Sequence, residues 1–281
     1  MELLDVEVKT LRSHTLPFEE TLIIPLGDIQ YGVAQCDVER LKKHVAWGAA
    51  RENAYFVGLG DYLDLASPSN RQRIANANLY DTPLEALDAQ AQKQLEELQE
   101  ILAPTVGRWL GLVSGHHFWK FQDGTTTDNR LANFLGCPWL DACGIIQVRF
   151  APPTSHVKAP SFRMFLHHGK GSGQMQAAPL NLLERFAGSW EGIDVFLMGH
   201  QHKKVAAKLR RLYPEFGAHA RLRHRNLIIG CTGSFLQSYE GGGGGYAERG
   251  MLGALAMGGL VIWARPRLIE GYTDVDLDVS L

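Results

Sequence analysis

The sequence predicts an α/β fold built around a parallel β-sheet, and two observations lead to this prediction. The segments TLIIPLGD (21–28) and AYFVGLGD (54–61) are short apolar runs that end in Gly-Asp, with a helical pattern between them. A strand, a helix and a second strand of these lengths form a βαβ unit with parallel strands. The chain has 281 residues, 45% hydrophobic and 21% charged, which is typical of a globular protein with a sizeable core. We therefore expect a single domain over residues 1–281.

The remaining elements are expected in chain order. The alternation of LDVEVKTL (4–11) favours an edge strand, and Asp37 is suited to cap a helix through about Arg51. A polar loop, SPSNRQR (67–73), leads into an amphipathic helix that begins near Thr82. Together they form a helical insertion at about residues 66–105.

Further strands and helices complete the expected order. Apolar runs predict strands at WLGLVSGHHF (109–118), IIQVRF (145–150), SFRMFLHH (161–168), IDVFLM (193–198), LIIGCTGSF (227–235), GLVIWA (259–264) and RLIEGYTDVDLDV (267–279). Helices are expected from Thr127, as the cap, to Leu135 and from Pro179 to Ala187. The last two strands are expected to complete a second sheet packed on the first.

Composition narrows the possible partners and compartments. The net charge of -2 is close to neutral, so attraction to an anionic partner must come from a local patch. The four cysteines are scattered without a CxxC pair, which favours a reducing, cytoplasmic location. No run approaches the roughly 20 apolar residues of a membrane span, so no membrane contact is expected.

Polar side chains follow five of the predicted strands where each strand ends. The endings read GD, GD, GHH, HHG and GHQH. In α/β sheets, ligands bind outside the carboxyl ends of strands because the loops converge there. Carboxylates and imidazoles bind divalent transition metals, and here there are more of them than one ion takes. These endings therefore predict a two-metal site, of the kind that serves phosphoester hydrolysis with a bridging carboxylate, here Asp61.

The blocks GDIQ, GDYLD, GHH, HHG and GHQH, within residues 21–235, resemble those of the calcineurin-like metallophosphoesterase superfamily, which run DxH, GDxxD, GNH, H and GHxH. The resemblance implies a four-layer αββα sandwich of two mixed β-sheets flanked by helices. It also implies a ligand set of Asp28, Gln30 and His202 for one metal, Asp61 as the bridge, and His116, His168 and His200 for the other. His117 would contact the phosphate and protonate the leaving oxygen, while a metal-bound hydroxide attacks phosphorus.

Two residues depart from the family pattern. Gln30 replaces a histidine, and His116 replaces an asparagine with an imidazole, which favours later metals. Two divalent ions are expected, manganese first, with magnesium, zinc, iron or nickel as alternatives. In the HHG block we prefer His168 over His167 as the ligand, because the family's ligand usually directly precedes a glycine.

The branch of the superfamily is indicated by two further positions. The phosphoprotein phosphatases carry an arginine and an acidic residue where this chain has Leu65 and Phe118. The chain therefore resembles the phosphodiesterase and nuclease-like branches, including bacterial and phage-encoded ones.

A basic run follows the last histidine block and suggests a substrate. Residues 203–229 are expected to form a β-hairpin whose basic face, with Lys203, Lys204, Arg210 and Arg223, would bind the phosphates of DNA or RNA. A solvated hairpin is the alternative, since charge runs usually face water. The glycine run Gly241–Gly245 is either a mobile substrate loop or a simple connection.

The predicted function is hydrolysis of a phosphodiester in nucleic acid or a nucleotide. A phosphomonoesterase of the same fold is the first alternative. The second is a non-catalytic scaffold that binds nucleic acid, which the departures at Gln30 and His116 keep open.

Overall fold

The computed structural model describes residues 10–77, 80–152, 154–171, 173–216, 220–239, 248, 251, 253–269 and 272–281. The edge strand expected at residues 4–11 lies mostly outside this part of the chain, and so does the glycine run Gly241–Gly245. The first strand that the structure describes is β1, Leu11–Leu16, which lies at one edge of a six-stranded sheet.

The first sheet has five strands in the order β11-β10-β2-β3-β4. They are β2 (Thr21–Leu26), β3 (Ala54–Gly58), β4 (Trp109–Leu112), β10 (Val261–Ile269) and β11 (Tyr272–Ser280). Strands β2, β3 and β4 are parallel, whereas β10 pairs antiparallel with both β2 and β11. The sheet is therefore mixed, and its three parallel strands end at one edge.

The second sheet has six strands in the order β1-β5-β6-β7-β9-β8. Besides β1 they are β5 (Cys143–Phe150), β6 (Ser161–His167), β7 (Val195–Met198), β8 (Val205–Glu215) and β9 (Arg221–Cys231). Strands β6, β7 and β9 are parallel, and β8 pairs antiparallel with β9 along its whole length. Strands β8 and β9 thus form a two-stranded arm at the edge of this sheet.

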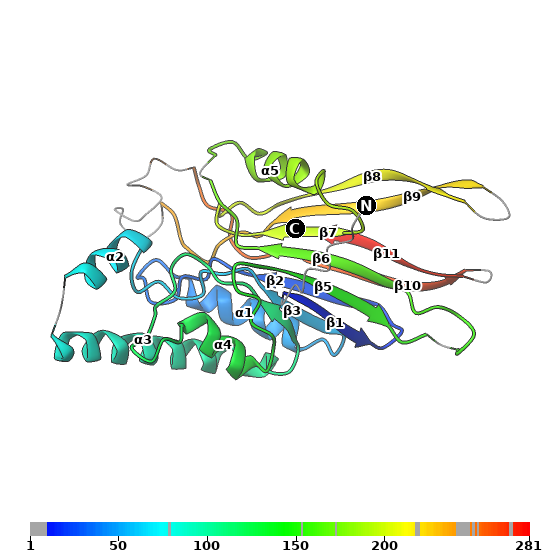
Figure 1. Cartoon of the computed structure of the whole chain (residues 1–281). Helices are drawn as coiled ribbons and strands as arrows, with labels where there is room; N and C mark the ends of the chain where they lie inside the picture. The colour runs from blue at the N-terminus through cyan, green and yellow to red at the C-terminus, as the bar shows by residue number, and fades with distance from the viewer. Residues whose placement is uncertain are drawn as a thin grey trace, which may run out of the picture.

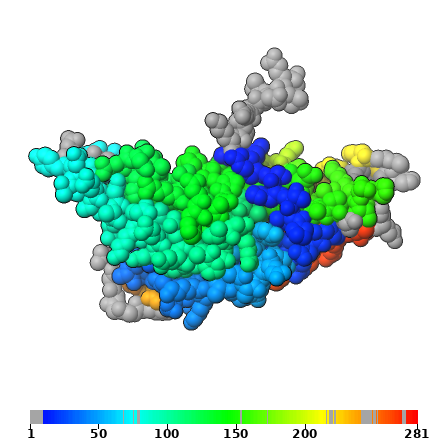
Figure 2. All heavy atoms as spheres, turned by 90° about the horizontal axis from the view of Figure 1, so that it is seen from below, coloured from blue at the N-terminus to red at the C-terminus, as the bar shows by residue number. Residues whose placement is uncertain are grey.

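Helices cover the outer faces of both sheets. They are α1 (Val38–Ala49), α2 (Pro68–Asn76), α3 (Asp81–Leu102), the 3-10 helix η1 (Ala103–Thr105), α4 (Thr127–Leu135) and α5 (Ala178–Ala187). Figure 1 shows α5 on one side of the sheets and α1, α3 and α4 on the other. Seen from below, the light blue to green segments that hold α1 to α4 spread over one face of the molecule (Figure 2).

Apolar side chains alternate between the layers as the strand period of two requires. Ile23 and Leu197 pack between the two sheets. Their neighbours point the other way: Ile24 packs toward the helices α1 and α3, and Phe196 packs toward α5. The predicted four-layer αββα arrangement of two mixed sheets flanked by helices is therefore confirmed.

One predicted loop is a helix. The polar segment 67–73 belongs mostly to α2, which begins at Pro68 and has Ser67 as its N-cap. The Ser67 hydroxyl accepts a hydrogen bond from the backbone N–H of Asn70 at 3.3 Å. A serine cap followed by proline is a helix start signal, and it outweighs the polar composition that suggested a loop. Similarly, α4 is capped by Thr126, one residue before the expected Thr127.

The last two strands also differ from expectation, because they extend the first sheet instead of building the second. Strand β10 pairs with β2, with Ile262 opposite Ile23. Ile262 and Ala264 are fully buried in the core between the sheets. Composition predicted two strands here, but β10 extends to Ile269 and so includes the first residues of the second expected strand, and β11 is an edge strand in which Leu277 is buried. Composition also does not specify which neighbours the strands pair with.

Within the described part of the chain, none of the helices has both the length and the apolar character that crossing a membrane requires.

Candidate metal centre

The two Gly-Asp segments leave their strands side by side. Beyond β2 and β3 the backbone N–H of Asp28 donates to the carbonyl of Gly60 at 3.0 Å, and that of Gln30 donates to the carbonyl of Asp61 at 2.9 Å. The parallel ladder therefore continues past the strand ends. It fixes both acidic side chains at the same edge of the first sheet.

Five of the predicted ligands have a left-handed backbone. The φ angles are 49° at Asp28, 49° at Gln30, 52° at Asp61, 68° at His200 and 52° at His202. Non-glycine residues adopt this conformation rarely, and clusters of them mark sites where the surrounding structure holds them in place. The chain turns sharply at each of these residues as it leaves a strand.

Two glycines allow the loops to approach the carboxylates closely. A Cβ atom on Gly115 would lie 2.0 Å from the backbone nitrogen of Asp61, and one on Gly199 would lie 2.7 Å from Asp28 Oδ2. Any side chain at Gly115 would displace Asp61. These positions explain why glycine precedes the histidines of the GHH and GHQH blocks.

Asp61 lies where three loops meet and is only 2% exposed. Its Oδ1 accepts the backbone N–H groups of His116 at 2.5 Å and His117 at 2.9 Å. Its Oδ2 lies 3.1 Å from Nε2 of His168. Burial alone would raise the pKa of Asp61, but the hydrogen bond and charge of His168 outweigh it and lower this pKa.

Asp28 connects the first sheet to the loop that follows β7. Its Oδ2 accepts the backbone N–H of His200 at 2.8 Å, and its Oδ1 lies 3.5 Å from Nε2 of His202. Asp28 is fully buried, and Gln30 and His202 are 5% and 6% exposed. The first predicted ligand set is thus brought together in the interior, from loops of both sheets.

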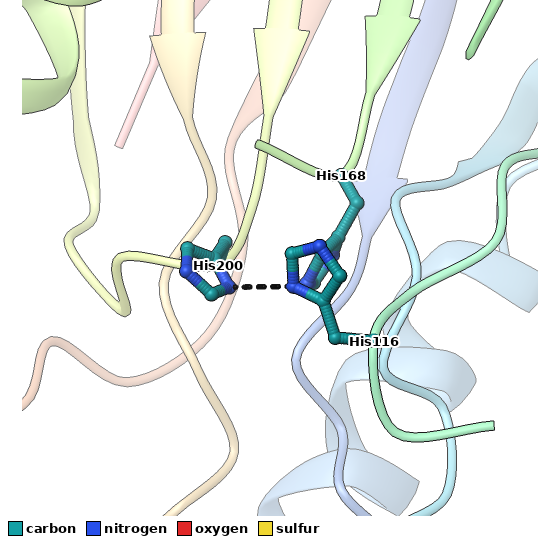
Figure 3. Close-up of side chains that lie close together, drawn as sticks. All are labelled: His116, His168 and His200. Carbon is teal, nitrogen blue, oxygen red and sulfur yellow. Dashed lines mark hydrogen bonds between the residues drawn. The ribbon is translucent and has the colours of Figure 1, made fainter. Parts of the chain in front are cut away.

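Three imidazoles converge beside these carboxylates, as Figure 3 shows for His116, His168 and His200. The Nδ1 atoms of His116 and His200 are 3.2 Å apart. One ring nitrogen from each of the three histidines lies within 4.8 Å of the others, a spacing that could hold a metal ion. Asp28, Asp61 and His168 form a second group with the same spacing, so His168 belongs to both.

The ring of His168 is oriented by the backbone. Its Nδ1 lies 2.7 Å from the carbonyl oxygen of Leu59, so this nitrogen donates and Nε2 faces the carboxylates. Burial lowers the pKa of His168, but the hydrogen bond and charge of Asp61 outweigh it and raise this pKa to about 9. The pKa of His200, in contrast, is lowered to about 4 by burial and by the neighbouring His168 and His116.

His167 points away from this group. Its Nδ1 accepts the backbone N–H of Gly169 at 2.7 Å, and its ring stacks near Phe165. Of the two neighbouring histidines, the structure therefore places His168 with the carboxylates and His167 outside them.

His117 is paired with a carboxylate to which sequence reasoning assigned no role. Its Nδ1 lies 2.8 Å from Asp64 Oδ1, while its Nε2 lies 4.0 Å from Asp61 Oδ2. Burial lowers the pKa of His117, but the hydrogen bond with Asp64 and the charges of Asp61 and Asp64 raise it overall. The signal for Asp64 was present in GDYLD, where it is the second acidic residue of the block.

Two more residues missed at the sequence level support the GHH loop. Arg71 of α2 donates to the backbone carbonyls of His116, at 3.1 Å, and of Phe118, and its guanidinium lies over the Phe118 ring. Asp128, at the start of α4, is 1% exposed and accepts the backbone N–H of Gly115 at 3.0 Å. Nothing in the sequence pattern distinguishes either residue from ordinary helix residues.

Buried polar atoms without partners test whether a metal suits this group. Among the described residues, Asp28 Oδ1 is buried without a hydrogen-bond partner and lies 3.5 Å from His202 Nε2, while His168 Nε2 has the Asp61 carboxylate at 3.1 Å. Both atoms are potential metal ligands that face the converging side chains. A carboxylate oxygen without a hydrogen bond is costly to bury, and a cation beside it would remove that cost. The donor set therefore fits divalent metal ions.

The basic residues predicted to bind substrate are not gathered at this site. Lys203 lies next to it and donates to the backbone carbonyls of Gly173 and, at 2.7 Å, Met175. Lys204 lines a separate hollow beside α1. Arg210 and Arg223 lie farther along the arm, opposite Asn226 and Tyr213.

The direction of the arm explains this separation. Strand β8 begins at Val205, three residues after His202. Each strand residue adds about 3.4 Å, so Arg210 lies roughly 17 Å along the strand from Val205. Figure 1 shows β8 and β9 extending toward the end of the molecule opposite α2. The arm therefore places Arg210 and Arg223 away from the predicted metal ligands, and their contact with a nucleic-acid backbone stays a prediction.

Comparisons with known proteins find solved structures of similar fold, but no similar sequence. No protein-family model matches the chain, and no curated protein matches its sequence. Among solved structures it is similar to Vacuolar Protein Sorting 29 from Cryptosporidium parvum, with 15% identity, a TM-score of 0.37 and coverage of 93% of this chain and 98% of that one.

Two further structures show a comparable likeness. A Vps29 double mutant from Entamoeba histolytica has 12% identity and a TM-score of 0.39, with coverage of 93% and 100% of the two chains. GAP50, the anchor in the inner membrane complex of Plasmodium, has 10% identity and a TM-score of 0.39, with coverage of 87% and 81%. These similarities concern the path of the chain and carry no conclusion about activity.

The Asp128 carboxyl group provides a pH test of this buried network. Burial raises its folded pKa to about 7. The folded state therefore binds a proton that the unfolded state loses above about pH 4, so wild-type stability falls as pH rises from 4 to 7. Asp128→Asn keeps an acceptor for Gly115 but does not ionise.

We expect Asp128→Asn to match the wild type near pH 4 and to be more stable at pH 8, by on the order of 2–4 kcal/mol. Urea unfolding of both proteins with chelator present, at the two pH values, measures this difference. A difference that does not change with pH would contradict the buried, neutral carboxyl group.

Proposed function

We propose that this chain is a dinuclear metal-dependent phosphoesterase of the calcineurin-like metallophosphoesterase superfamily, in the phosphodiesterase and nuclease-like branch with bacterial and phage-encoded members. The observation that carries the proposal is the convergence of carboxylates and imidazoles from five strand ends. The donors are Asp28 and Asp61 together with His116, His168 and His200, in two groups whose ligand atoms lie within 4.8 Å of one another. Such convergence of buried and half-buried titratable groups is typical of a functional site.

The residues divide into two ligand sets around Asp61. Asp28, Gln30 and His202 would hold one ion, and His116, His168 and His200 would hold the other, with Asp61 between them. When bound, two such ions lower the pKa of water and neutralise charge on a phosphoryl group. Oxygen donors suit manganese or magnesium, whereas three imidazoles suit later ions such as zinc, iron or nickel. We propose two divalent ions, with manganese as the first choice.

His117 and Asp64 would together supply a proton to the leaving group. Asp64 accepts from Nδ1 of His117, which fixes the ring and leaves Nε2 facing the carboxylates. The raised pKa of His117 favours the protonated imidazole near neutral pH. His117 is thus suited to donate a proton to the leaving oxygen, and Asp64 to stabilise the imidazolium and hold its position.

The proposed substrate is a phosphodiester of a nucleotide or nucleic acid. Leu65 and Phe118 support this class, because the residues of the protein-phosphatase branch are replaced there. Lys203 is the cation nearest to the predicted ligands among the four predicted substrate residues, and a phosphate oxygen would be attracted to it. Nucleic acid remains the proposed partner, with the reacting phosphate expected near Lys203.

We expect Asp61→Asn to abolish metal-dependent hydrolysis, because the substitution removes the negative charge shared by both ligand sets. The assay is release of nitrophenolate from bis(p-nitrophenyl) phosphate, with manganese, magnesium, zinc and nickel in turn. The matched control is Asp278→Asn, which changes an exposed carboxylate of β11. An unchanged rate in Asp61→Asn would overturn the proposed centre, and no hydrolysis by the wild type would favour a non-catalytic scaffold.

A second pair of variants separates proton transfer from metal binding. His117→Ala is expected to retain the metal content while lowering kcat by about 10²–10⁴-fold, the usual contribution of a general acid. Asp64→Asn should shift the alkaline limb of the kcat–pH profile to lower pH, since it weakens the interaction that raises the pKa of His117 and keeps its imidazole protonated. Loss of metal from His117→Ala would instead assign this residue to the ligands.

A further inference from the structure

Two hollows meet at the predicted metal ligands. The smaller has a volume of about 110 Å³ and the larger about 310 Å³. Both are lined by His200, His202 and Leu255. The histidines of the GHQH block therefore lie on the border between two spaces that extend to either side of the site.

Only the smaller hollow contains the predicted proton donor. His117 and its partner Asp64 line this hollow together with Asp61 and Gln30. Among the described residues that line the larger hollow there is no carboxylate, and its one lysine, Lys203, is held by the carbonyls of Gly173 and Met175. An oxygen that leaves phosphorus can take a proton from His117 on one side of the site only.

The larger hollow has the chemistry of a binding pocket for a polar organic group. Three glutamine side chains line it, and each amide can both donate and accept hydrogen bonds. Leu255 and Ala254 contribute apolar surface. Paired donor and acceptor atoms match the edges of nucleobases, and the volume is at the lower end of small-molecule pockets. A nucleoside fits this combination, whereas a single phosphate would leave most of the space unused.

The wall of the larger hollow is tied down before any ligand binds. Gln201 Nε2 donates to the carbonyl of Lys170 at 3.0 Å, and Lys203 Nζ donates to that of Met175 at 2.7 Å. These bonds connect the loop after β6 to the loop after β7. Binding therefore does not require this part of the wall to become ordered first, which favours affinity.

We propose that the protein cleaves phosphodiesters in one orientation, with the leaving group in the smaller hollow beside His117 and a retained nucleoside in the larger hollow. This inference rests on the proposed phosphodiesterase function. In the reaction the oxygen of water forms a bond to phosphorus and the bond from phosphorus to the leaving oxygen breaks. The leaving oxygen takes a proton from His117, the attacking water loses a proton to solvent, and His117 regains one from solvent, so the reaction consumes one water molecule overall. The products are an alcohol and a nucleoside monophosphate.

The orientation is tested with three substrates that share one leaving group. These are p-nitrophenyl phosphate, methyl p-nitrophenyl phosphate and thymidine 5′-(p-nitrophenyl phosphate), which differ only in the retained group. We expect kcat/KM for the thymidine diester to exceed that for the methyl diester by about tenfold or more, equivalent to about 1.4 kcal/mol. The monoester should be the poorest of the three.

A variant that fills the larger hollow sharpens the test. A Cβ atom added to Gly253 would meet no atom of the described residues within 4 Å, so the wall has room for the ring of Gly253→Trp. We expect this variant to bring the ratio of thymidine to methyl diester close to one. Ser155→Trp, in the exposed loop between β5 and β6, is the matched control and should leave the ratio unchanged.

Binding of thymidine 5′-monophosphate and of inorganic phosphate to the metal-loaded protein, measured by calorimetry, tests the hollow without catalysis. Tighter binding of the nucleotide, weakened by Gly253→Trp, supports the proposal. Equal affinity for the two ligands, or equal kcat/KM for the two diesters, overturns it. If no ester is hydrolysed with any metal, the proposed function fails, and the calorimetric result still decides the question of the hollow.

Discussion

Two buried carboxylates, Asp28 and Asp61, tie the loops of both sheets together by accepting backbone N–H groups. Asp61 holds the GHH loop through the N–H groups of His116 and His117, and Asp28 holds the GHQH loop through that of His200. Two neighbouring negative charges are unfavourable in the interior unless cations balance them. His168, whose pKa is raised to about 9, supplies one positive charge to the metal-free protein. Divalent ions would supply more positive charge. The same two carboxylates that hold the loops in place would therefore also favour metal binding.

The backbone is strained at the predicted ligands. Left-handed φ angles at five predicted ligands cost on the order of 1 kcal/mol each. Hydrogen bonds that continue the ladder of β2 and β3 past the strand ends hold Asp28 and Asp61 in this conformation. Gly115 and Gly199 let the neighbouring loops approach without a clash. The ends of rigid strands, and not the loops alone, therefore set the geometry of the site.

Much of the site could be predicted from the sequence because its residues directly follow apolar strands. Asp28, Asp61 and His168 lie where strand endings place them. Contacts that depend on three-dimensional packing could not be predicted. Arg71 contacts the GHH loop from helix α2, and the polar composition of that segment predicted a loop instead of a helix. For the same reason, the alternation of the basic run predicts a hairpin, but the direction of β8, which moves Arg210 away from the site, follows from pairing with β9.

The most direct test of the two-metal centre is elemental analysis of protein purified without chelator. Proton release measured in the same preparation, on adding metal to the stripped protein, reports whether His168 gives up its proton to an ion. The account predicts about two ions per chain, as a dinuclear site requires, together with proton release. A stripped protein that takes up no metal, or takes it up without releasing protons, would contradict it.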